Sequence, residues 1–277
     1  MSLKDEDKVV RFPPPPAAAP PVTLAPVVRP SAALINHPLG VDLSGKPKAL
    51  FFIGRGRVGK THLLRWAAET SAERGGDFIV SAADPTNRAL VNYLDDVAQP
   101  PTTDPIEVRD WLLSLLQHAM SQNISLMIDL GGGDTSLTEL LKVLPNLTEL
   151  MEEGGLAPVA LHLVGTDAHD LHALATTEQM GFQPKATAIV LNEVYARGGQ
   201  RYRFDEVTSH PVYQAAIDRG AVPIWMPALI EEVTRYCARD GGRFLNVPRS
   251  KPFFAQAVKN WLGAMSAEFS PIATWWP

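Results

Sequence analysis

The residues with the clearest chemical pattern lie near the start of the apolar part of the chain. They read Gly54-Arg55-Gly56-Arg57-Val58-Gly59-Lys60-Thr61 and fit G-x-x-x-x-G-K-[ST], the phosphate-binding P-loop. In such a loop the backbone N–H groups surround phosphate oxygens, and the N-terminus of the next helix adds partial positive charge. The lysine reaches the β- and γ-phosphates, and the threonine hydroxyl coordinates Mg²⁺. The sequence therefore predicts a nucleotide-phosphate site formed by Gly54, Gly56, Arg57, Val58, Gly59, Lys60, Thr61 and His62.

The elements that must position this loop alternate along the chain. Short apolar runs predict strands at 49–53, 78–82, 125–130, 159–164, 187–191 and 222–226. Amphipathic stretches predict helices at about 61–74, 105–122, 135–153, 168–180, 210–219 and 253–267. This alternation predicts an α/β fold of three layers, with a mostly parallel sheet flanked by helices.

Polar residues follow several of these strands, at the edge where α/β sheets bind ligands. Asp84 follows the strand at 78–82, and Asp129 lies near the end of the strand at 125–130. Carboxylates at these places predict Mg²⁺ ligands, although an aspartate there is also a common turn residue. Asn192 is either a nucleobase contact or a turn residue. Asp167 is predicted to cap the helix at 168–180.

These motifs resemble those of the ParA/MinD family of P-loop ATPases, the deviant-Walker group. The family motif Lys-Gly-Gly-x-Gly-Lys-Thr aligns with 55–61, and its Asp-x-Asp-Pro-Gln motif aligns with 82–86. The Walker B aspartate of the family matches Asp129, and its adenine-contacting asparagine matches Asn192. The resemblance covers roughly residues 48–230.

The resemblance implies ATP and Mg²⁺ as cofactors and a homodimer that forms when nucleotide binds. In the family, a signature lysine contacts the phosphates of the partner subunit, and Arg55 holds that place here. The implied catalytic residues are Lys60, Asp84 and Arg55, with Asp84 orienting the attacking water. The implied metal ligands are Thr61, Asp129 and Asp84.

Two departures from the family pattern affect the expected activity. Arg57 replaces the second glycine of the loop, and Ala82 replaces the first aspartate of the second motif. We therefore expect ATP binding with slow hydrolysis, in a switch acting in plasmid or DNA partition, conjugative transfer or cargo positioning. The alternatives are an ATP-binding scaffold with impaired hydrolysis, and a metabolic P-loop ligase or kinase.

Composition and charge indicate how the chain divides into domains and which partners it could bind. Residues 1–45, with four prolines at 13–16, predict a disordered Pro-rich tail that is either a linker or a docking segment for a protein partner. Residues 46–277 are predicted to form the nucleotide-binding domain. The net charge of −5 differs from that of a dedicated nucleic-acid binder. However, residues 185–260 carry 11 basic and 7 acidic side chains, a net charge of +4, so a non-specific DNA contact stays open.

The remaining features concern location and isolated residues. A single cysteine, Cys237, allows no intrachain disulfide, and no signal peptide or membrane span is evident. We expect a cytoplasmic protein without stable membrane insertion. The apolar stretch near the C-terminus is predicted to pack in the core, and the role of Trp275-Trp276 is left open. A structural role is expected for His162, His169 and His172, whereas Arg197, Arg201 and Arg203 with Tyr195 and Tyr202 form a candidate contact cluster.

Overall fold

The computed structural model describes residues 39–84, 89–131, 136–196, 199–239, 243–247 and 250–277. Most of the predicted tail therefore lies outside the described residues. So do Arg197 of the candidate contact cluster and the residues that follow Asp84 in the second family motif.

Six parallel strands form one sheet in the order β2-β3-β1-β4-β5-β6, which confirms the predicted α/β fold. β1 lies at the centre with β3 on one side and β4 on the other. All residues of β1, β4 and β5 are buried, as parallel strands covered on both faces require. The strands are β1 (Lys48–Ile53), β2 (Phe78–Ala82), β3 (Ser125–Asp129), β4 (Ala157–Val164), β5 (Ala186–Asn192) and β6 (Val222–Met226).

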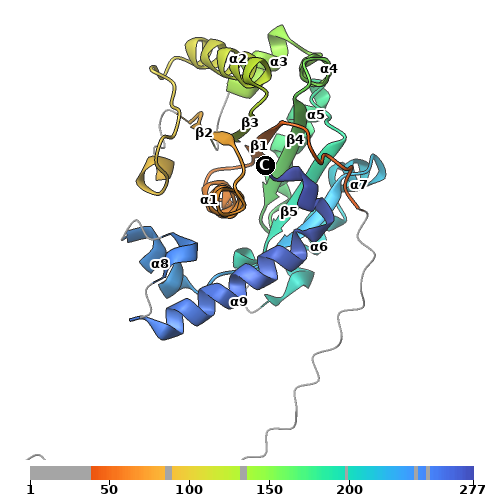
Figure 1. Ribbon diagram of the computed structural model, residues 1–277. Coiled ribbons are helices and arrows are strands. Elements are labelled where there is room, and N and C mark those ends of the chain that lie inside the picture. Colours follow the sequence, from red (N-terminus) through yellow and green to blue (C-terminus); the bar gives the residue numbers. More distant parts are fainter. Residues whose placement is uncertain (1–38, 85–88, 132–135, 197–198, 240–242, 248–249) are drawn as a thin grey trace, which may run out of the picture. The chain divides into compact units, whose positions relative to one another are not determined.

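Helices cover both faces of the sheet (Figure 1). Because strand side chains alternate, Leu50 and Phe52 face one layer and Phe51 faces the other. The first layer contains α1 (Lys60–Glu73), α8 (Glu231–Arg239) and α9 (Pro252–Glu268). The second contains α2 (Pro105–Gln122), α3 (Ser136–Val143), α4 (Leu147–Glu153), α5 (His172–Gln179), α6 (Asp205–Thr208) and α7 (Pro211–Asp218).

Two of the predicted helices differ from the structure. The helix expected at 135–153 is two helices, α3 and α4, because Pro145 lies between them and has no N–H to continue the ladder. The helix expected at 168–180 begins as a 3₁₀ turn over Ala168–Leu171 before α5 starts. Asp167 caps this turn by accepting the N–H of His169, as the sequence predicts.

The C-terminal segment packs on the body of the domain. In α9, Val258, Trp261 and Met265 are buried, as predicted for this apolar stretch. The prediction is wrong for Phe253, at the first turn of the helix, which is 86% exposed. Trp275 is fully buried, and its indole N–H donates to the carbonyl of Val41 at 2.8 Å. The N–H of Gly40 donates to the carbonyl of Pro271 at 3.0 Å. Gly40, Val41 and Leu43, assigned to the tail from sequence, therefore contact the C-terminal segment.

The histidine in β4 is buried within the sheet. His162 is 2% exposed, and neither ring nitrogen has a hydrogen-bond partner among the described residues. Burial, with a smaller contribution from the charge of Arg219, lowers the pKa of His162 from 6.5 to about 3. The unfolded chain takes up this proton below pH 6.5 and the folded chain does not, so stability is lost as the pH falls from 6.5 towards 3.

We expect His162→Leu to remove this part of the acid sensitivity. Between pH 7 and pH 5 the variant should lose about 2 kcal/mol less unfolding free energy than the wild type, at 1.36 kcal/mol per pKa unit. Urea unfolding followed by circular dichroism at both pH values measures the difference. His118→Gln, an exposed site on α2, is the matched control and should keep the wild-type pH dependence. Equal losses in His162→Leu and the wild type would contradict the prediction.

Candidate functional site

The P-loop joins β1 to α1. The backbone conformation and close contacts of the loop favour glycine at two positions. Gly54 has φ 146° and Gly59 has φ 107°. A Cβ atom on Gly54 would lie 2.6 Å from the Leu163 carbonyl oxygen, and one on Gly59 would lie 2.5 Å from the Asn192 amide nitrogen. Arg57 also lies in the left-handed region, with φ 67°, at a cost of about 1–2 kcal/mol that a glycine avoids. The replacement of the family glycine thus leaves the left-handed conformation in place.

Lys60 holds the base of this loop together. Its ammonium group donates to the carbonyl of Gly54 at 2.8 Å and to that of Arg55 at 3.0 Å. The side chain is buried and lines a cavity above the loop. These two loop carbonyls therefore share the charge of a lysine that faces the cavity.

The predicted magnesium ligands lie together at the edge of the sheet. β3 pairs with β1 in parallel, which brings Asp129 beside the P-loop. The Thr61 hydroxyl donates to a carboxylate oxygen of Asp129 at 2.7 Å. Asp84, just beyond β2, lines the same cavity. It packs so closely on Gly131 that a Cβ there would lie 2.9 Å from its carboxylate.

These groups fit Mg²⁺, which prefers hard oxygen ligands and keeps several waters. The described residues contain no group of three or more His, Cys, Asp or Glu side chains able to hold a metal by themselves. A magnesium ion here would depend on Thr61, Asp129 and Asp84 together with phosphate oxygens and water.

The cavity has a volume of about 380 Å³ and extends past the loop. Of the predicted phosphate-binding residues, Gly54 and Val58 are buried and do not line it. Those that do are Gly56, Arg57, Gly59, Lys60, Thr61 and His62. Beyond them the cavity reaches Arg65 and Tyr93 and then Thr234 and Ala238 of α8.

Two α1 residues shape this far end. The Arg65 guanidinium lies over the Tyr93 ring at 4.2 Å and over the Phe244 ring at 4.1 Å. The His62 ring packs against Phe244 and Trp261. Burial, and then the charge of Arg65, lower the pKa of His62 to about 4. His62 is therefore neutral near pH 7 and adds no charge to the phosphate site.

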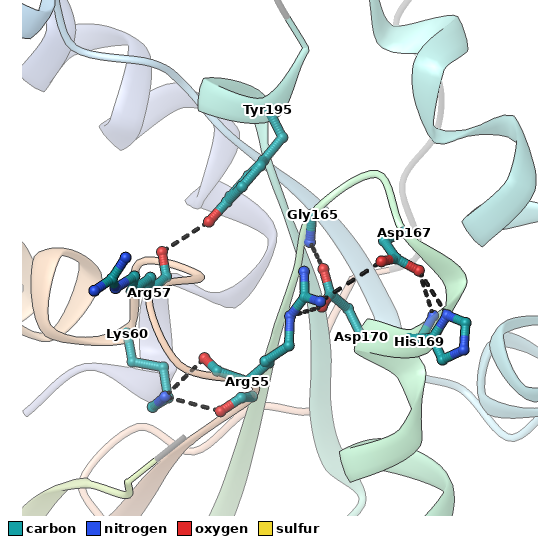
Figure 2. A network of polar contacts seen from close by, with 9 residues as sticks. Arg55, Arg57, Lys60, Gly165, Asp167, His169, Asp170 and Tyr195 are labelled. Carbon is teal, nitrogen blue, oxygen red and sulfur yellow. Dashed lines mark hydrogen bonds and ion pairs between the residues drawn. The ribbon is translucent and has the colours of Figure 1, made fainter. Parts of the chain in front are cut away.

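The segment that ends β5 supports the loop from the other side. The Asn192 amide donates to the Val58 carbonyl at 2.9 Å, and its oxygen accepts the Val194 N–H at 3.1 Å. Asn192 is buried and is not among the residues that line the cavity, so its nucleobase contact stays a prediction. The Tyr195 hydroxyl donates to the Arg57 carbonyl at 2.7 Å (Figure 2). No local sequence signal marks this role of Tyr195.

Arg55 points away from the cavity. Its Nε lies 2.7 Å from a carboxylate oxygen of Asp170, and a terminal nitrogen lies 3.5 Å from Asp167 (Figure 2). Its side chain is 53% exposed, whereas that of Asp170 is 1% exposed. Asp170 was not singled out from the sequence. A polar residue four positions into a capped turn carries no local sign of burial.

The candidate contact cluster is partly tied into the fold. Arg201 lies 4.5 Å over the Trp225 ring and pairs with Glu193 at 2.6 Å and with Glu268 at 2.7 Å. The positive charge of Arg201 is therefore paired with two carboxylates of its own chain. Tyr202 is exposed.

Known proteins resemble this chain at low sequence identity. No model of a protein family matches the sequence, and no curated protein matches it. Among solved structures, FtsY from Mycoplasma mycoides is similar at 17% identity and a TM-score of 0.40, over 59% of this chain and 58% of that one. The cell division protein FtsY from Thermotoga maritima is similar at 14% and 0.46, over 79% and 70%. The signal recognition particle receptor FtsY from Elizabethkingia anophelis is similar at 15% and 0.43, over 78% and 66%.

These similarities do not assign the chain to a family, and the chain spans less than two thirds of the Mycoplasma protein's length. The P-loop α/β fold follows instead from the sheet and the loop described above. In the described part of the chain, no helix is long and apolar enough to cross a lipid bilayer.

We expect Tyr195→Phe to weaken nucleotide binding by roughly five- to tenfold, because the loss of one hydrogen bond to the loop costs about 1 kcal/mol. Isothermal titration calorimetry measures the affinity. Tyr202→Phe is the matched control, since that hydroxyl bonds only an exposed Gln200 side chain at 3.1 Å in the described contacts. Equal affinities for Tyr195→Phe and the wild type would show that the loop does not depend on this contact.

Proposed function

We propose that this protein is an ATP-binding, slowly hydrolysing dimerisation switch of the ParA/MinD type. The observation that carries the proposal is the 2.7 Å contact between the Thr61 hydroxyl and Asp129. It brings the P-loop threonine and the Walker B aspartate together, as binding of a magnesium nucleotide requires. Lys60 and Asp84 line the same cavity.

Each residue then has a distinct task. Lys60 moves its charge from the loop carbonyls to the β- and γ-phosphates. Thr61 and Asp129 hold Mg²⁺, which neutralises developing negative charge on the phosphates when bound. Asp84 orients the attacking water from the neighbouring strand end. Hydrolysis is slow because Ala82 supplies no carboxylate at the place of the family's first aspartate.

The position of Arg55 supports the proposed dimer. Its guanidinium lies outside the cavity of its own chain and is half exposed. From there it is able to meet the phosphates of a nucleotide held by a second copy, as the family resemblance implies. ATP is favoured over GTP because Asn192 is followed by Glu193-Val194-Tyr195 and not by the rest of an Asn-Lys-x-Asp guanine motif.

The biological setting rests on the resemblance alone. Plasmid or DNA partition, conjugative transfer and cargo positioning are the tasks it suggests, in the cytoplasm. A protein partner for the Pro-rich tail and a non-specific DNA contact within residues 185–260 belong to the same proposal.

A second candidate function is phosphoryl transfer to a small molecule, as in a P-loop kinase or ligase. The observation that favours it is the extension of the cavity past the phosphate loop to Arg65, Tyr93 and Thr234. This end provides room for an acceptor beside the γ-phosphate. Phosphoryl transfer to a small molecule would not require a dimer.

The test is size-exclusion chromatography with light scattering, with and without Mg-ATP. We expect the wild type to shift from monomer to dimer with Mg-ATP and not with Mg-ADP. Lys60→Ala should abolish the shift and weaken ATP binding roughly 10- to 100-fold, because a charge-assisted hydrogen bond contributes about 1.5–3 kcal/mol. Lys142→Ala, an exposed lysine on α3, is the matched control.

The same oligomeric state with and without Mg-ATP would contradict the proposed dimerisation switch. ATP binding and dimerisation without measurable phosphate release would instead support the alternative function, an ATP-binding scaffold with impaired hydrolysis. Replacing ATP by GTP in the same assay tests the choice of base.

A further inference from the structure

A buried carboxylate lies on the β4 side of the P-loop. Asp170 belongs to the turn between β4 and α5, and its side chain is 1% exposed. One of its oxygens lies 2.7 Å from Nε of Arg55, and the other accepts the N–H of Gly165 at 2.7 Å (Figure 2). The contact with Gly165 is a hydrogen bond and the contact with Arg55 is an ion pair, since Oδ1 has no hydrogen-bond partner among the described residues. Each oxygen of this carboxylate is therefore engaged by one neighbour.

Asp170 packs closely against the backbone at the end of β4. Gly165 lies between it and the Tyr195 ring, and a Cβ at Gly165 would lie 2.9 Å from the Asp170 carboxylate and 3.1 Å from that ring. Tyr195 in turn bonds the Arg57 carbonyl. The segments that follow β4 and β5 thus support two points of the P-loop, Arg55 through Asp170 and Arg57 through Tyr195.

The two carboxylates beside Arg55 are not equivalent. Asp167 is 46% exposed and lies 3.5 Å from the guanidinium, so solvent screens the attraction. Asp170 is buried, and moving Arg55 away would leave an uncompensated charge inside the protein, which is strongly unfavourable. Asp170 therefore fixes the guanidinium, and Asp167 contributes little.

We propose that Asp170 is the positioning residue of Arg55. It holds the guanidinium at the rim of the P-loop, outside the cavity of its own chain, ready for an anionic group supplied from outside. Given the function proposed above, that group is a phosphate of the nucleotide bound to a second copy.

The geometry also accounts for arginine in place of the family's lysine. A planar guanidinium with five donors is able to hold a carboxylate along one edge and present terminal nitrogens to a second anion. A lysine ammonium is a single point charge. Paired with a buried Asp170, it would have no comparable fork to extend.

The first arm of the test needs no nucleotide. Phenylglyoxal modifies accessible arginines, and peptide mass spectrometry follows the rate at Arg55 in the wild type, Asp170→Asn and Asp167→Asn. We expect roughly fivefold or faster modification in Asp170→Asn, because a charge-assisted contact is lost, and less than about a twofold change in Asp167→Asn. The rate at Arg57 serves as the internal control. Equal rates at Arg55 in Asp170→Asn and the wild type would overturn the positioning role.

The second arm measures the consequence for the nucleotide. Asp170→Asn and Arg55→Ala should each lower Mg-ATP-driven dimerisation and kcat about tenfold, because each variant loses one charge-assisted contact. The Kd for Mg-ADP should stay within about twofold of the wild-type value. Combined in one protein, they should lower kcat no further than Arg55→Ala alone, since Asp170 acts through Arg55.

Several outcomes would overturn the proposal. Weaker Mg-ADP binding in Asp170→Asn, or a further loss of kcat in the Arg55→Ala background, would make Asp170 a purely structural residue. A higher kcat in Asp170→Asn would mean that Asp170 restrains Arg55. Thermal unfolding checks that each variant is folded.

If Asp170→Asn does not fold, Arg55→Lys replaces it, because it keeps the charge opposite Asp170 and removes the fork. It should lose dimerisation and kcat like Arg55→Ala, and wild-type values in Arg55→Lys would overturn the proposal. A wild type that neither dimerises nor hydrolyses Mg-ATP would refute the proposed function, whereas the modification rates would still decide whether Asp170 positions Arg55.

Discussion

A phosphate-binding loop needs its backbone carbonyls held outward, because only then are its N–H groups left for an anion. Donors from two parts of the chain, α1 and the segment that ends β5, contact the carbonyls of this loop. Lys60 bonds the carbonyls of Gly54 and Arg55 from α1, Tyr195 bonds that of Arg57, and Asn192 bonds that of Val58. The parallel sheet makes this possible, since it places the ends of β1, β4 and β5 along one edge.

Carboxylates lie on both sides of this loop, and their surroundings give them different chemistry. Asp129 and Asp84 line the cavity on the β3 and β2 side, where phosphate and metal ion are expected. Asp170 lies on the β4 side, buried and paired with Arg55, and is not among the residues that line the cavity. The negative charge of Asp170 is therefore compensated within the protein, which limits its repulsion of a bound anion.

Aromatic packing supports the layer that carries α1. Trp66 of α1 contacts the rings of Phe269 and Trp276, at centroid distances of 5.0 and 5.4 Å. The C-terminal segment, through Trp275, also holds residues 40 and 41. This packing fixes the helix whose N-terminus faces the cavity, so the last residues of the chain contribute to the rigidity of the site.

The sequence by itself determined the local features of this protein. Apolar runs and amphipathic periods placed all six strands and most helices, and the glycine spacing placed the P-loop, because these patterns depend on neighbouring residues. Only the tertiary structure decided the contacts of Asn192 and Tyr195, which bond loop residues 134 and 138 positions away. The same holds for the burial of Asp170 and the docking of Trp275. Such contacts depend on the order of strands in the sheet, and the alternation of strands and helices is compatible with many orders.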